Sequence, residues 1–566
     1  MEKPWLSSYE PVVPPMLTFS HLNLFELLVA SAKSFPKNPA ARLILSYLAG
    51  GRVTIGGELN YTQLLNHVEH FANALYQLGV RKGDRIALML PNTLHYVISF
   101  FAAMRIGAII VNNNPTYTAR ELKHQLVDSG AETIIILNLF YPRLREIQVD
   151  TSVKRVIVAH MYDLLSFPSK QLVKAKQQRD ASWVTVQPEH DIFFFQRLIE
   201  KYPSVAPAVH VDLDDVAVLQ YTGGTTGTPK AAMLTHRNLN VNATQIGSWF
   251  TTADQGVEKF MCAIPFFHVY GLVVALVYGI SIGAELQIIP NPRPIDNVMN
   301  IMQKERSTVY PGVPAMYIGI VNHPKVDTYD LRSIKACLSG SAAMPVEIQT
   351  RFNDLTGGRL IEGFGMTELS PVSHANPLMG VSKKGSVGIP LPNTNAQIVD
   401  LETGEVIPIG SEATGELWVS GPQVMKGYWN KPEETAQTIT PDGWLRTGDI
   451  ARTDSDGYFY IVDRLKDMII VSGLKVLPRD VEEVLYMHPQ IREAAVVGIP
   501  NATRGDDTVT AFIVTHDGSP IDVEALKVFC KQYLADFKVP RRYEFREELP
   551  KTAVGKVLRR ALVETK

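Results

Sequence analysis

The apolar positions in the first two hundred residues follow two different periods. Over 61–78 and 94–105 they recur every three or four residues, which predicts two helices. Short apolar runs at 85–90, 109–112 and 133–137 predict buried strands. Helices that alternate with buried strands favour a largely parallel sheet with helices on its faces.

This alternation breaks between about Met161 and Pro203. A basic run over 170–179 and the aromatic cluster Phe193-Phe194-Phe195 occur there. One interpretation is an amphipathic element that lies on an anionic bilayer. The other, which we favour, is a solvated surface insertion.

The second half of the chain begins with a new α/β pattern. Thr235 is a candidate N-cap, and strand and helix signals then continue through Leu360. From Gly385 to Asp463 short strands alternate with turn signals, which predicts a small barrel or twisted sheet. The last hundred residues have mixed α+β character and are long enough for a separate domain.

These patterns predict the α/β fold class and two domains. The first, 1–463, is expected to hold two α/β subdomains and a small β-barrel-like subdomain. The second, 464–566, is expected to be a small α+β domain that is joined to the first by a hinge near 464–467.

Composition supports an ordinary globular enzyme. A chain of 566 residues is longer than one hydrophobic core usually organises, so two to four domains or subdomains are expected. With 46% apolar residues, 20% charged residues and a formal net charge of -2, nothing points to nucleic acid as a partner. Cys262, Cys337 and Cys530 lie far apart without metal-like spacing, which indicates reduced thiols in the cytoplasm.

Two segments bear on membranes. The first residues lack the basic and apolar regions of a secretory signal. The stretch 260–284 contains no Asp, Glu, Lys or Arg, but Pro265, His268 and Gly271 interrupt it, so we expect a buried segment and no membrane span. Peripheral contact with a membrane surface stays open.

A glycine- and threonine-rich segment carries the first chemical signal. Its glycines let backbone N–H groups turn toward phosphate oxygens, its hydroxyls add donors or a metal contact, and its lysine adds charge. It does not have Walker A spacing, and an extended run, 231–234, follows it, so we expect a strand-loop-strand arrangement. The segment comprises Tyr221, Thr222, Gly223, Gly224, Thr225, Thr226, Gly227, Thr228, Pro229 and Lys230.

Three further polar motifs follow in the chain. In Gly363-Phe-Gly-Met-Thr-Glu368, an aromatic face precedes a hydroxyl and a carboxylate that are suited to phosphate and a hard divalent cation. Asp449, after a predicted tight turn, is suited to accept hydrogen bonds from a ribose diol. Lys556, on a glycine-bearing loop, is suited to reach an oxyanion.

Taken together and in this order, these motifs resemble the adenylate-forming superfamily of acyl-CoA synthetases, luciferases and peptide-synthetase adenylation domains. The resemblance extends from the predicted helix at Tyr61 to Lys556, and within the superfamily it is to the bacterial long-chain fatty acid-CoA ligases. Further matching segments are Leu234–Asn238, Ser339–Ala342, Gly421–Trp429, Ile461–Ser472 and Phe545–Pro550.

The resemblance implies a two-step ligation that uses ATP, Mg²⁺ and coenzyme A. A fatty acid carboxylate attacks the α-phosphate of ATP and releases pyrophosphate, and the coenzyme A thiol then displaces AMP. The enzyme's part is positioning and electrostatics, because no covalent enzyme nucleophile is needed.

The resemblance also implies roles for individual residues. Thr222 and Glu368 would bind Mg²⁺, and the loop with Thr225, Thr226 and Lys230 would hold pyrophosphate. Lys556 would bridge the acyl carboxylate and the α-phosphate, and it is our main catalytic candidate. Thr367 would lie near the phosphates of the nucleotide, and Asp449 and Arg464 would contact its ribose. The adenine would be contacted by Gly340, Ser341, Ala342, Glu362, Gly363 and Phe364.

The family also reorients its C-terminal domain between the two steps. Lys466 would act at the hinge, and Ser472, Gly473 and Lys475 would approach coenzyme A. His268 resembles the family's aromatic-histidine motif beside the acyl site, and the run 272–280 with Gly312 is a candidate wall of an acyl tunnel. A homodimer stays open.

The sequence departs from the family pattern at two positions. Phe364 stands where many members carry tyrosine, and Ala231 stands where glycine is frequent. Three alternatives also remain: an acyl-AMP ligase that loads a carrier protein, a medium-chain or aryl acid-CoA ligase, and a non-catalytic nucleotide sensor with the same fold.

Overall fold

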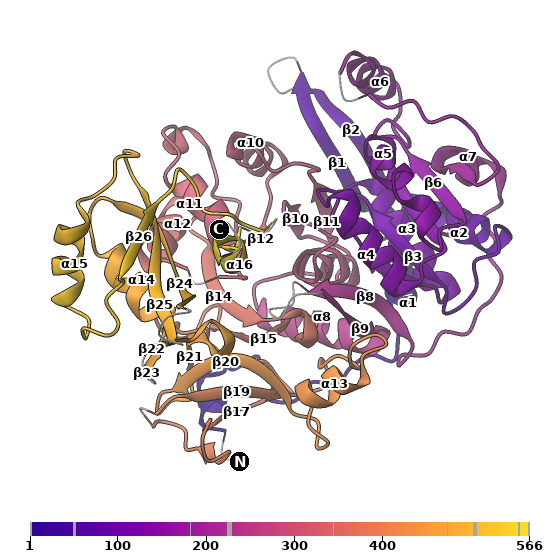
Figure 1. Cartoon of the computed structure of the whole chain (residues 1–566). Coiled ribbons are helices and arrows are strands. Elements are labelled where there is room, and N and C mark those ends of the chain that lie inside the picture. The colour runs from indigo at the N-terminus through magenta and orange to yellow at the C-terminus, as the bar shows by residue number, and fades with distance from the viewer. Residues whose placement is uncertain are drawn as a thin grey trace. The chain divides into compact units, whose positions relative to one another are not determined.

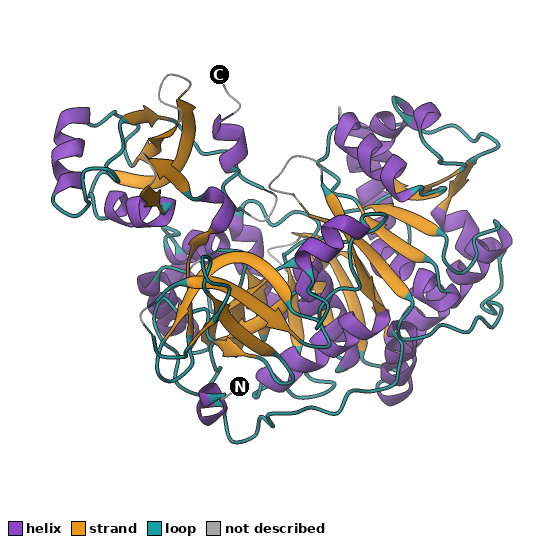
Figure 2. Ribbon diagram, turned by 60° about the horizontal axis from the view of Figure 1, so that its bottom comes forward, coloured by secondary structure: helices purple, strands orange, loops and turns teal. Residues whose placement is uncertain are grey.

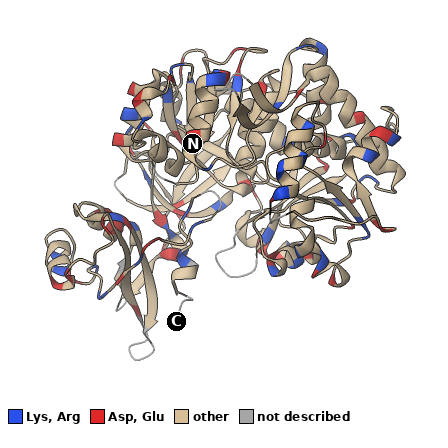
Figure 3. Ribbon diagram, turned by 90° about the horizontal axis from the view of Figure 1, so that it is seen from above, with Lys and Arg blue, Asp and Glu red and all other residues tan. Residues whose placement is uncertain are grey.

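The structure is a computed structural model that describes residues 3–48, 53–180, 183–222, 229–342, 344–411, 413–471, 474–501, 506–552 and 555–563. Contacts between residues divide the chain into two compact units. Unit 1 comprises Met1–Ser7, Asn395–Ser420 and Thr440–Lys566, and unit 2 comprises Ser8–Thr394 and Gly421–Ile439. Positive and negative residues are interspersed over the elements of both units (Figure 3).

Unit 2 contains a seven-stranded sheet in the order β7-β6-β5-β3-β4-β8-β9 (Figure 1). All neighbours are parallel except β8 and β9, which form an antiparallel pair. The central strands are short runs of buried aliphatic residues, as expected for a sheet that is covered on both faces. The strands are β3 (Arg85–Met89), β4 (Ile109–Asn112), β5 (Thr133–Leu137), β6 (Arg155–Ala159), β7 (Ile192–Phe194), β8 (Val216–Thr222) and β9 (Lys230–Thr235).

Unit 2 also contains a nine-stranded sheet in the order β16-β15-β14-β13-β12-β10-β11-β1-β2. Its six central strands, β14 to β1 in this order, are parallel, and antiparallel strands complete both edges. The strands are β1 (Pro39–Leu48), β2 (Val53–Asn60), β10 (Lys259–Cys262), β11 (Glu285–Ile288), β12 (Val309–Gly312), β13 (Ala336–Ser339), β14 (Arg359–Gly365), β15 (Val372–Ala375) and β16 (Ile389–Pro390).

Helices form three layers around these two sheets (Figure 2). The middle layer contacts both sheets and contains α1 (Leu24–Ser34), α2 (Tyr61–Gln77), α3 (Leu94–Ile106), α8 (His236–Trp249), the π-helix η5 (Gly271–Val277) and α9 (Tyr278–Ser281). The outer face of the seven-stranded sheet is covered by α4 (Ala119–Ser129) and α5 (Tyr141–Arg145). The nine-stranded sheet is covered by α10 (Ile295–Glu305), α11 (Pro314–Val321) and α12 (Val346–Thr356). The remaining helices of unit 2 are α6 (Ser169–Arg179), α7 (Phe195–Lys201) and α13 (Pro432–Thr438).

Unit 1 begins with a five-stranded antiparallel sheet in the order β18-β17-β19-β20-β21. Short alternating strands and frequent turns produce this sheet, as the sequence pattern predicts. The strands are β17 (Asn395–Val399), β18 (Val406–Ile407), β19 (Gly415–Ser420), β20 (Leu445–Thr453) and β21 (Phe459–Arg464).

The C-terminal part of unit 1 has a three-stranded sheet, β24-β25-β26. Side chains alternate between its faces: Val496 and Ala511 pack toward α14 and α15, whereas Val497 and Phe512 pack toward Leu562 of α16. The elements are β22 (Ile469–Val471), β23 (Leu474–Val476), α14 (Pro478–Tyr486), β24 (Ile491–Asn501), β25 (Asp506–Thr515), α15 (Val523–Lys531), β26 (Arg542–Phe545) and α16 (Arg559–Val563).

The expected fold class is confirmed, with two α/β sheets, a smaller β-sheet and a C-terminal α+β part. Thr235 caps α8 as expected, because its hydroxyl oxygen accepts the backbone N–H of Asn238. The charge-free stretch 260–284 forms β10, η5 and α9 and is largely buried. Among the helices in the described ranges, none combines the length and hydrophobicity that a membrane-spanning helix requires. The domain boundary at 463 stays a prediction.

Two local expectations need correction. Asp449 does not follow a tight turn but lies within β20, beside an irregularity in its pairing with β19, where Gly448 has a φ of +69°. Phe195 of the aromatic cluster at 193–195 does not face a membrane, because it is fully buried against Phe71.

Candidate active site

The predicted adenine residues come together at the carboxyl edge of the nine-stranded sheet. Ser339 at the end of β13 pairs in register with Glu362 of β14, and the next residues along the two parallel strands are Gly340, just after β13, and Gly363, within β14. Ligands of α/β sheets bind at this edge. The hydroxyl group of Tyr270 donates to the carbonyl oxygen of Leu338, and its ring lies against Gly340.

Phe364 lies on the same edge and is partly exposed. Its ring contacts His374 edge to face, with 5.9 Å between the centroids. Burial lowers the pKa of His374 to about 3, so this imidazole is neutral and serves as a packing surface. Ser341 and Ala342 follow β13, and Ser341 has a φ of +73°, which turns the chain sharply after the strand.

Strands flank the glycine-rich segment on both sides, as expected. Thr222 at the end of β8 pairs with Lys230 at the start of β9 in an antiparallel pair. The hydroxyl group of Tyr221 donates to Asp128 at 2.7 Å, and the carbonyl oxygen of Pro229 accepts from His124. The predicted phosphate contacts Gly223, Gly224, Thr225, Thr226, Gly227 and Thr228 lie outside the described residues.

Glu368 lies in a short 3-10 helix, Thr367–Leu369, and is 6% exposed. Tyr428 donates its hydroxyl hydrogen to Glu368 Oε1 at 2.7 Å. Thr222 and Glu368 carry the hard oxygen atoms that Mg²⁺ prefers. A cluster of three or more metal-ligating side chains does not occur in the part of the chain that the structure describes. Mg²⁺ is commonly held by one or two carboxylates together with substrate phosphates.

A short segment, Met425–Trp429, connects Glu368 with β9, and we call it the strap. The backbone N–H of Met425 donates to the carbonyl oxygen of Glu368 at 2.9 Å. Lys426 and Trp429 donate from their backbone N–H groups to the carbonyl oxygens of Met233 and Ala231. Ala231 is buried in the core together with Trp429, so the alanine at this family position contributes packing at the strap.

His268 follows β10 and is half-buried. Burial lowers its pKa to about 4, so the imidazole is neutral near pH 7. Its Nδ1 accepts the backbone N–H of Tyr270 at 3.3 Å, which places the remaining ring hydrogen on Nε2. His268 is therefore suited to donate a hydrogen bond and unsuited to carry positive charge.

In unit 1, buried Asp449 forms an ion pair with partly exposed Arg464. They face each other across β20 and β21, and Arg464 Nε lies 2.9 Å from Asp449 Oδ1. Burial raises the pKa of Asp449 above its ordinary value, while Arg464 and Lys556 oppose that rise. Among the described residues, Asp449 Oδ2 has no hydrogen-bond donor although it is buried. This oxygen fits the predicted role, because a ribose hydroxyl would satisfy it.

Lys556 belongs to a tight hairpin in unit 1. Lys551 and Val557 form a β-bridge, and Gly555 makes the turn with a φ of +77°. Burial, and then the charge of Arg464, lowers the pKa of Lys556 to about 8. The negative charge of Asp449 opposes this lowering. Lys466, in the 3-10 helix Leu465–Asp467, acts on the same two groups.

The predicted coenzyme A residues are only partly described. Ser472 and Gly473 lie outside the described residues, and Lys475 is placed on β23 opposite Ile470. Arg559 of α16 pairs with Asp467 at 2.9 Å and with Glu482 at 2.8 Å, which links the hinge segment to α14. Sequence reasoning missed Arg559 and also Tyr428, although Tyr428 belongs to a segment, Gly421–Trp429, that was recognised as a family match.

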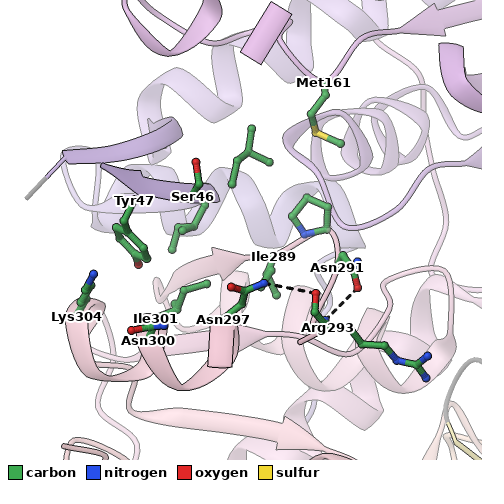
Figure 4. Close-up of a pocket in the computed structure, with 13 residues that line it drawn as sticks. Ser46, Tyr47, Met161, Ile289, Asn291, Arg293, Asn297, Asn300, Ile301 and Lys304 are labelled. Atoms are coloured by element: carbon green, nitrogen blue, oxygen red, sulfur yellow. Dashed lines mark hydrogen bonds between the residues drawn. The ribbon is translucent and has the colours of Figure 1, made fainter. Parts of the chain in front are cut away.

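A cavity of about 630 Å³ lies elsewhere in unit 2, at the carboxyl ends of β1 and β11 (Figure 4). Met161 points toward it from one side, and Tyr47 and Lys304 lie at one end. None of the predicted site residues lines it. Its wall mixes aliphatic side chains with amides, and nothing in the described residues connects it with the candidate active site.

The sequence matches two conserved domain families. Residues 30–429 match the family described as AMP-binding enzyme, and residues 480–556 match the family described as AMP-binding enzyme C-terminal domain. The first match contains the glycine-rich segment, His268 and Glu368, and the second contains Lys556. Asp449, Arg464, Lys466, Ser472, Gly473 and Lys475 lie between the two matched ranges.

Curated relatives extend the match to the whole chain. A long-chain-fatty-acid–CoA ligase of Bacillus subtilis (strain 168) is 42% identical over 565 residues, which cover 100% of this chain and 98% of the relative. A long-chain-fatty-acid–CoA ligase of Salmonella typhimurium is 39% identical, with coverage of 99% and 98%. A feruloyl-CoA synthase of Amycolatopsis sp is 36% identical and covers 89% of this chain and 93% of its own length.

Solved structures share the fold. The ATP-bound RpMatB-BxBclM chimera B1 superimposes with a TM-score of 0.82 at 28% identity, with 96% of this chain and 98% of that chain covered. The anthranilate CoA ligase AuaEII in complex with anthranoyl-AMP superimposes with a TM-score of 0.80 at 25% identity, with coverage of 96% and 97%. Both neighbours thus hold ligands of an adenylating reaction.

Proposed function

The chain belongs to the family of AMP-binding enzymes, and from this premise we propose that it is an AMP-forming long-chain fatty acid–CoA ligase. It takes a fatty acid, ATP and coenzyme A to acyl-CoA, AMP and pyrophosphate. The observation that carries the proposal is the full-length similarity, at 42% and 39% identity, to curated long-chain-fatty-acid–CoA ligases. The feruloyl-CoA relative is less similar and matches over a shorter part of the chain.

The reaction proceeds in two displacements. A carboxylate oxygen of the fatty acid forms a bond to the α-phosphorus of ATP, and the bond to pyrophosphate breaks. The coenzyme A sulfur then forms a bond to the acyl carbon, the bond to the AMP oxygen breaks, and the thiol proton leaves to solvent. Both steps need two anionic groups held together, so the enzyme contributes positioning and positive charge.

Residues of unit 2 hold ATP at the carboxyl edge of the nine-stranded sheet. Gly340, Ser341, Ala342 and the segment Glu362–Phe364 receive the adenine, and Phe364 offers the ring face. Lys230 and the glycine-rich loop bind pyrophosphate oxygens. Mg²⁺ neutralises phosphate charge when it is bound, and Thr222 and Glu368 are the residues that would hold it, with Thr367 beside the phosphates.

Residues of unit 1 complete the nucleotide contacts. Asp449 accepts the ribose hydroxyls on the oxygen that otherwise lacks a donor, and Arg464 keeps this carboxylate ionised and oriented. Lys556 binds the acyl carboxylate and the α-phosphate together, which lowers the repulsion between them. Ser472, Gly473 and Lys475 are proposed to contact coenzyme A, and Lys466 is proposed to change conformation between the steps.

The acyl group is proposed to lie near His268 and the π-helix η5. A π-helix is rare and frequently occurs at functional sites. Each CH₂ group that the protein removes from water contributes about 0.8 kcal/mol to binding. Neutral His268 can donate its Nε2 hydrogen to the substrate carboxylate without adding a charge that competes with Lys556.

A panel of acids tests the function. We expect AMP and acyl-CoA formation from C12 to C18 fatty acids with ATP, Mg²⁺ and coenzyme A, and a much lower kcat/KM for ferulic acid. A higher kcat/KM for ferulic acid would support the aryl alternative. Transfer from acyl-AMP to a carrier protein but not to coenzyme A would support the acyl-AMP ligase alternative, and no acid-dependent ATP–pyrophosphate exchange would support a non-catalytic sensor.

We also propose a cytoplasmic protein that contacts the inner membrane face peripherally. Helix α6 supports this, because it carries Lys170, Lys174, Lys176 and Arg179 and no acidic residue. Phe167, which precedes α6, is 79% exposed, and Leu172 on α6 is 45% exposed. Basic residues beside exposed apolar side chains suit an anionic lipid surface.

Light scattering of the purified protein decides whether it is a homodimer.

A further inference from the structure

We propose that Tyr428 is a positioning residue for the adenylation step, and that it orients the carboxylate of Glu368 for Mg²⁺ and ATP. The inference rests on the proposed role of Glu368 as a metal-binding residue. It adds a residue that neither the conserved-domain matches nor the sequence motifs assign to the reaction.

Tyr428 contacts Glu368 directly in a buried position. Tyr428 is 8% exposed, Glu368 is 6% exposed, and the phenol hydrogen is donated to Glu368 Oε1 over 2.7 Å. Hydrogen bonds to an ionised carboxylate are among the strong ones, especially away from water. Because one oxygen is held, rotation about the last side-chain bond is restricted, and the positions of both carboxylate oxygens are set.

The strap holds Tyr428 from both sides. The strap is bonded to β9 through Ala231 and Met233, and Met425 is bonded to the carbonyl oxygen of Glu368. Tyr428 itself forms a β-bridge with Ala232. Tyr428 and Glu368 are therefore linked through the main chain as well as through their side chains, although 60 positions separate them in the sequence.

The ring of Tyr428 also lies beneath Lys230. The Lys230 ammonium group is 5.2 Å from the centroid of the Tyr428 ring. One side chain thus contacts the carboxylate proposed to hold Mg²⁺ and the lysine proposed to hold pyrophosphate, which couples their positions.

The phenol can act only as a donor here. An ionised carboxylate can only accept, so the hydrogen of the 2.7 Å contact with Glu368 Oε1 comes from the phenol. Tyr428 consequently orients a charged group and is not itself an acid or a base in the reaction.

Tyr428→Phe tests the proposal, with Tyr61→Phe as the matched control. Tyr61 is also fully buried and donates one hydrogen bond, to the carbonyl oxygen of Ala284, but it belongs to the start of α2 and does not contact Glu368. We expect Tyr428→Phe to raise the Mg²⁺ concentration for half-maximal ATP–pyrophosphate exchange by about 10-fold. Tyr61→Phe should leave this concentration unchanged. Both variants should lower the melting temperature by a similar amount.

Two further measurements separate positioning from folding and from the proposed function. Calorimetry should show weaker binding of the Mg²⁺ complex of a non-hydrolysable ATP analogue to Tyr428→Phe, with metal-free analogue binding unchanged. This measurement does not depend on the identity of the acid, so it decides the role of Tyr428 even if no fatty acid supports exchange. Tyr428→Leu should weaken pyrophosphate binding as well, because it also removes the ring beneath Lys230.

A double-mutant cycle with Glu368→Gln gives the sharpest outcome. If Tyr428 acts through Glu368, Tyr428→Phe should have no further effect on metal dependence in the Glu368→Gln background. If the double variant changes the Mg²⁺ dependence by the product of the two single effects, the proposal is overturned. So would a Tyr428→Phe enzyme with the Mg²⁺ dependence and Mg²⁺–nucleotide affinity of the wild type.

Discussion

Individual charged residues in unit 1 have properties that follow from their burial. Asp449 is 2% exposed and pairs with Arg464 at hydrogen-bonding distance. Lys556 adds a second positive charge whose pKa is lowered to about 8. An ammonium group with such a pKa is charged near pH 7 but has lost much of its hydration, so it interacts strongly with an incoming anion.

This pKa predicts a pH dependence for the adenylation step. If the charged form of Lys556 is required, kcat/KM for ATP–pyrophosphate exchange should fall as the pH rises through about 8. Lys556→Arg should abolish this descending limb at a lower overall rate, because a guanidinium group stays protonated. Lys556→Ala should lose adenylation by several orders of magnitude but keep much of the thioester formation from supplied acyl-AMP.

Unfolding does not account for the expected fall in kcat/KM as the pH rises. Because the folded pKa of Lys556 lies below its ordinary value of 10.5, this group destabilises the folded protein while it is charged. Its contribution to stability therefore rises between pH 8 and 10.5, as the folded state releases the proton first. If kcat/KM for ATP–pyrophosphate exchange is unchanged between pH 8 and 10.5, the Lys556 proton is not needed for adenylation.

At the scale of single elements, irregular segments carry much of the proposed chemistry. The π-helix η5 follows His268, a pairing irregularity in β20 holds Asp449, and the strap holds Tyr428. Regular strands and helices support these irregular segments. The side chain of Asn238 in α8, for example, donates to the carbonyl oxygens of Pro422 and Val424 just before the strap.

Helix α6 gives a prediction at this scale. In flotation assays, the protein should bind vesicles that contain anionic lipid and should be released by salt, because its basic side chains attract the surface. Phe167→Ala together with Leu172→Ala should reduce binding to anionic vesicles without changing kcat on a soluble fatty acid. Equal binding of the wild type and the double variant would argue against α6 as the contact.

At the scale of the whole molecule, the proposed catalytic residues are divided between the two units. The glycine-rich loop, Glu368 and His268 belong to unit 2, whereas Asp449, Lys466 and Lys556 belong to unit 1. A two-step reaction can use such a division, because a different set of residues from one unit can serve each step. We propose that the segment around Lys466 provides the change from one set of residues to the other.

Lys466→Pro tests this division of steps. Proline restricts φ, so the variant should form acyl-AMP at a rate close to that of the wild type but lose acyl-CoA formation by about 100-fold or more. Single-turnover measurements of each step on the full chain separate the two effects. Steady-state acyl-CoA synthesis at the wild-type rate would place the hinge elsewhere.

The sequence predicts local structure well where one pattern dominates. The predicted helix at 61–78 corresponds to α2, and the apolar runs at 109–112 and 133–137 correspond to β4 and β5. These predictions succeed because burial imposes its period directly on the residues concerned. The position of Asp449 was harder to predict, because an irregularity in strand pairing depends on the partner strand and not on the residues around it alone.

The sequence by itself therefore determined the fold class, the family and most of the candidate site residues, because motifs and periodicity are local properties of the chain. Only the tertiary structure decided that Tyr428 holds Glu368, that Asp449 pairs with Arg464 near Lys556, and that Phe195 faces the core. Contacts between distant residues depend on how whole elements pack, and residue order alone does not specify that packing. The same packing removes water from these polar groups, so the structure also sets their pKa values and hydrogen-bond strengths.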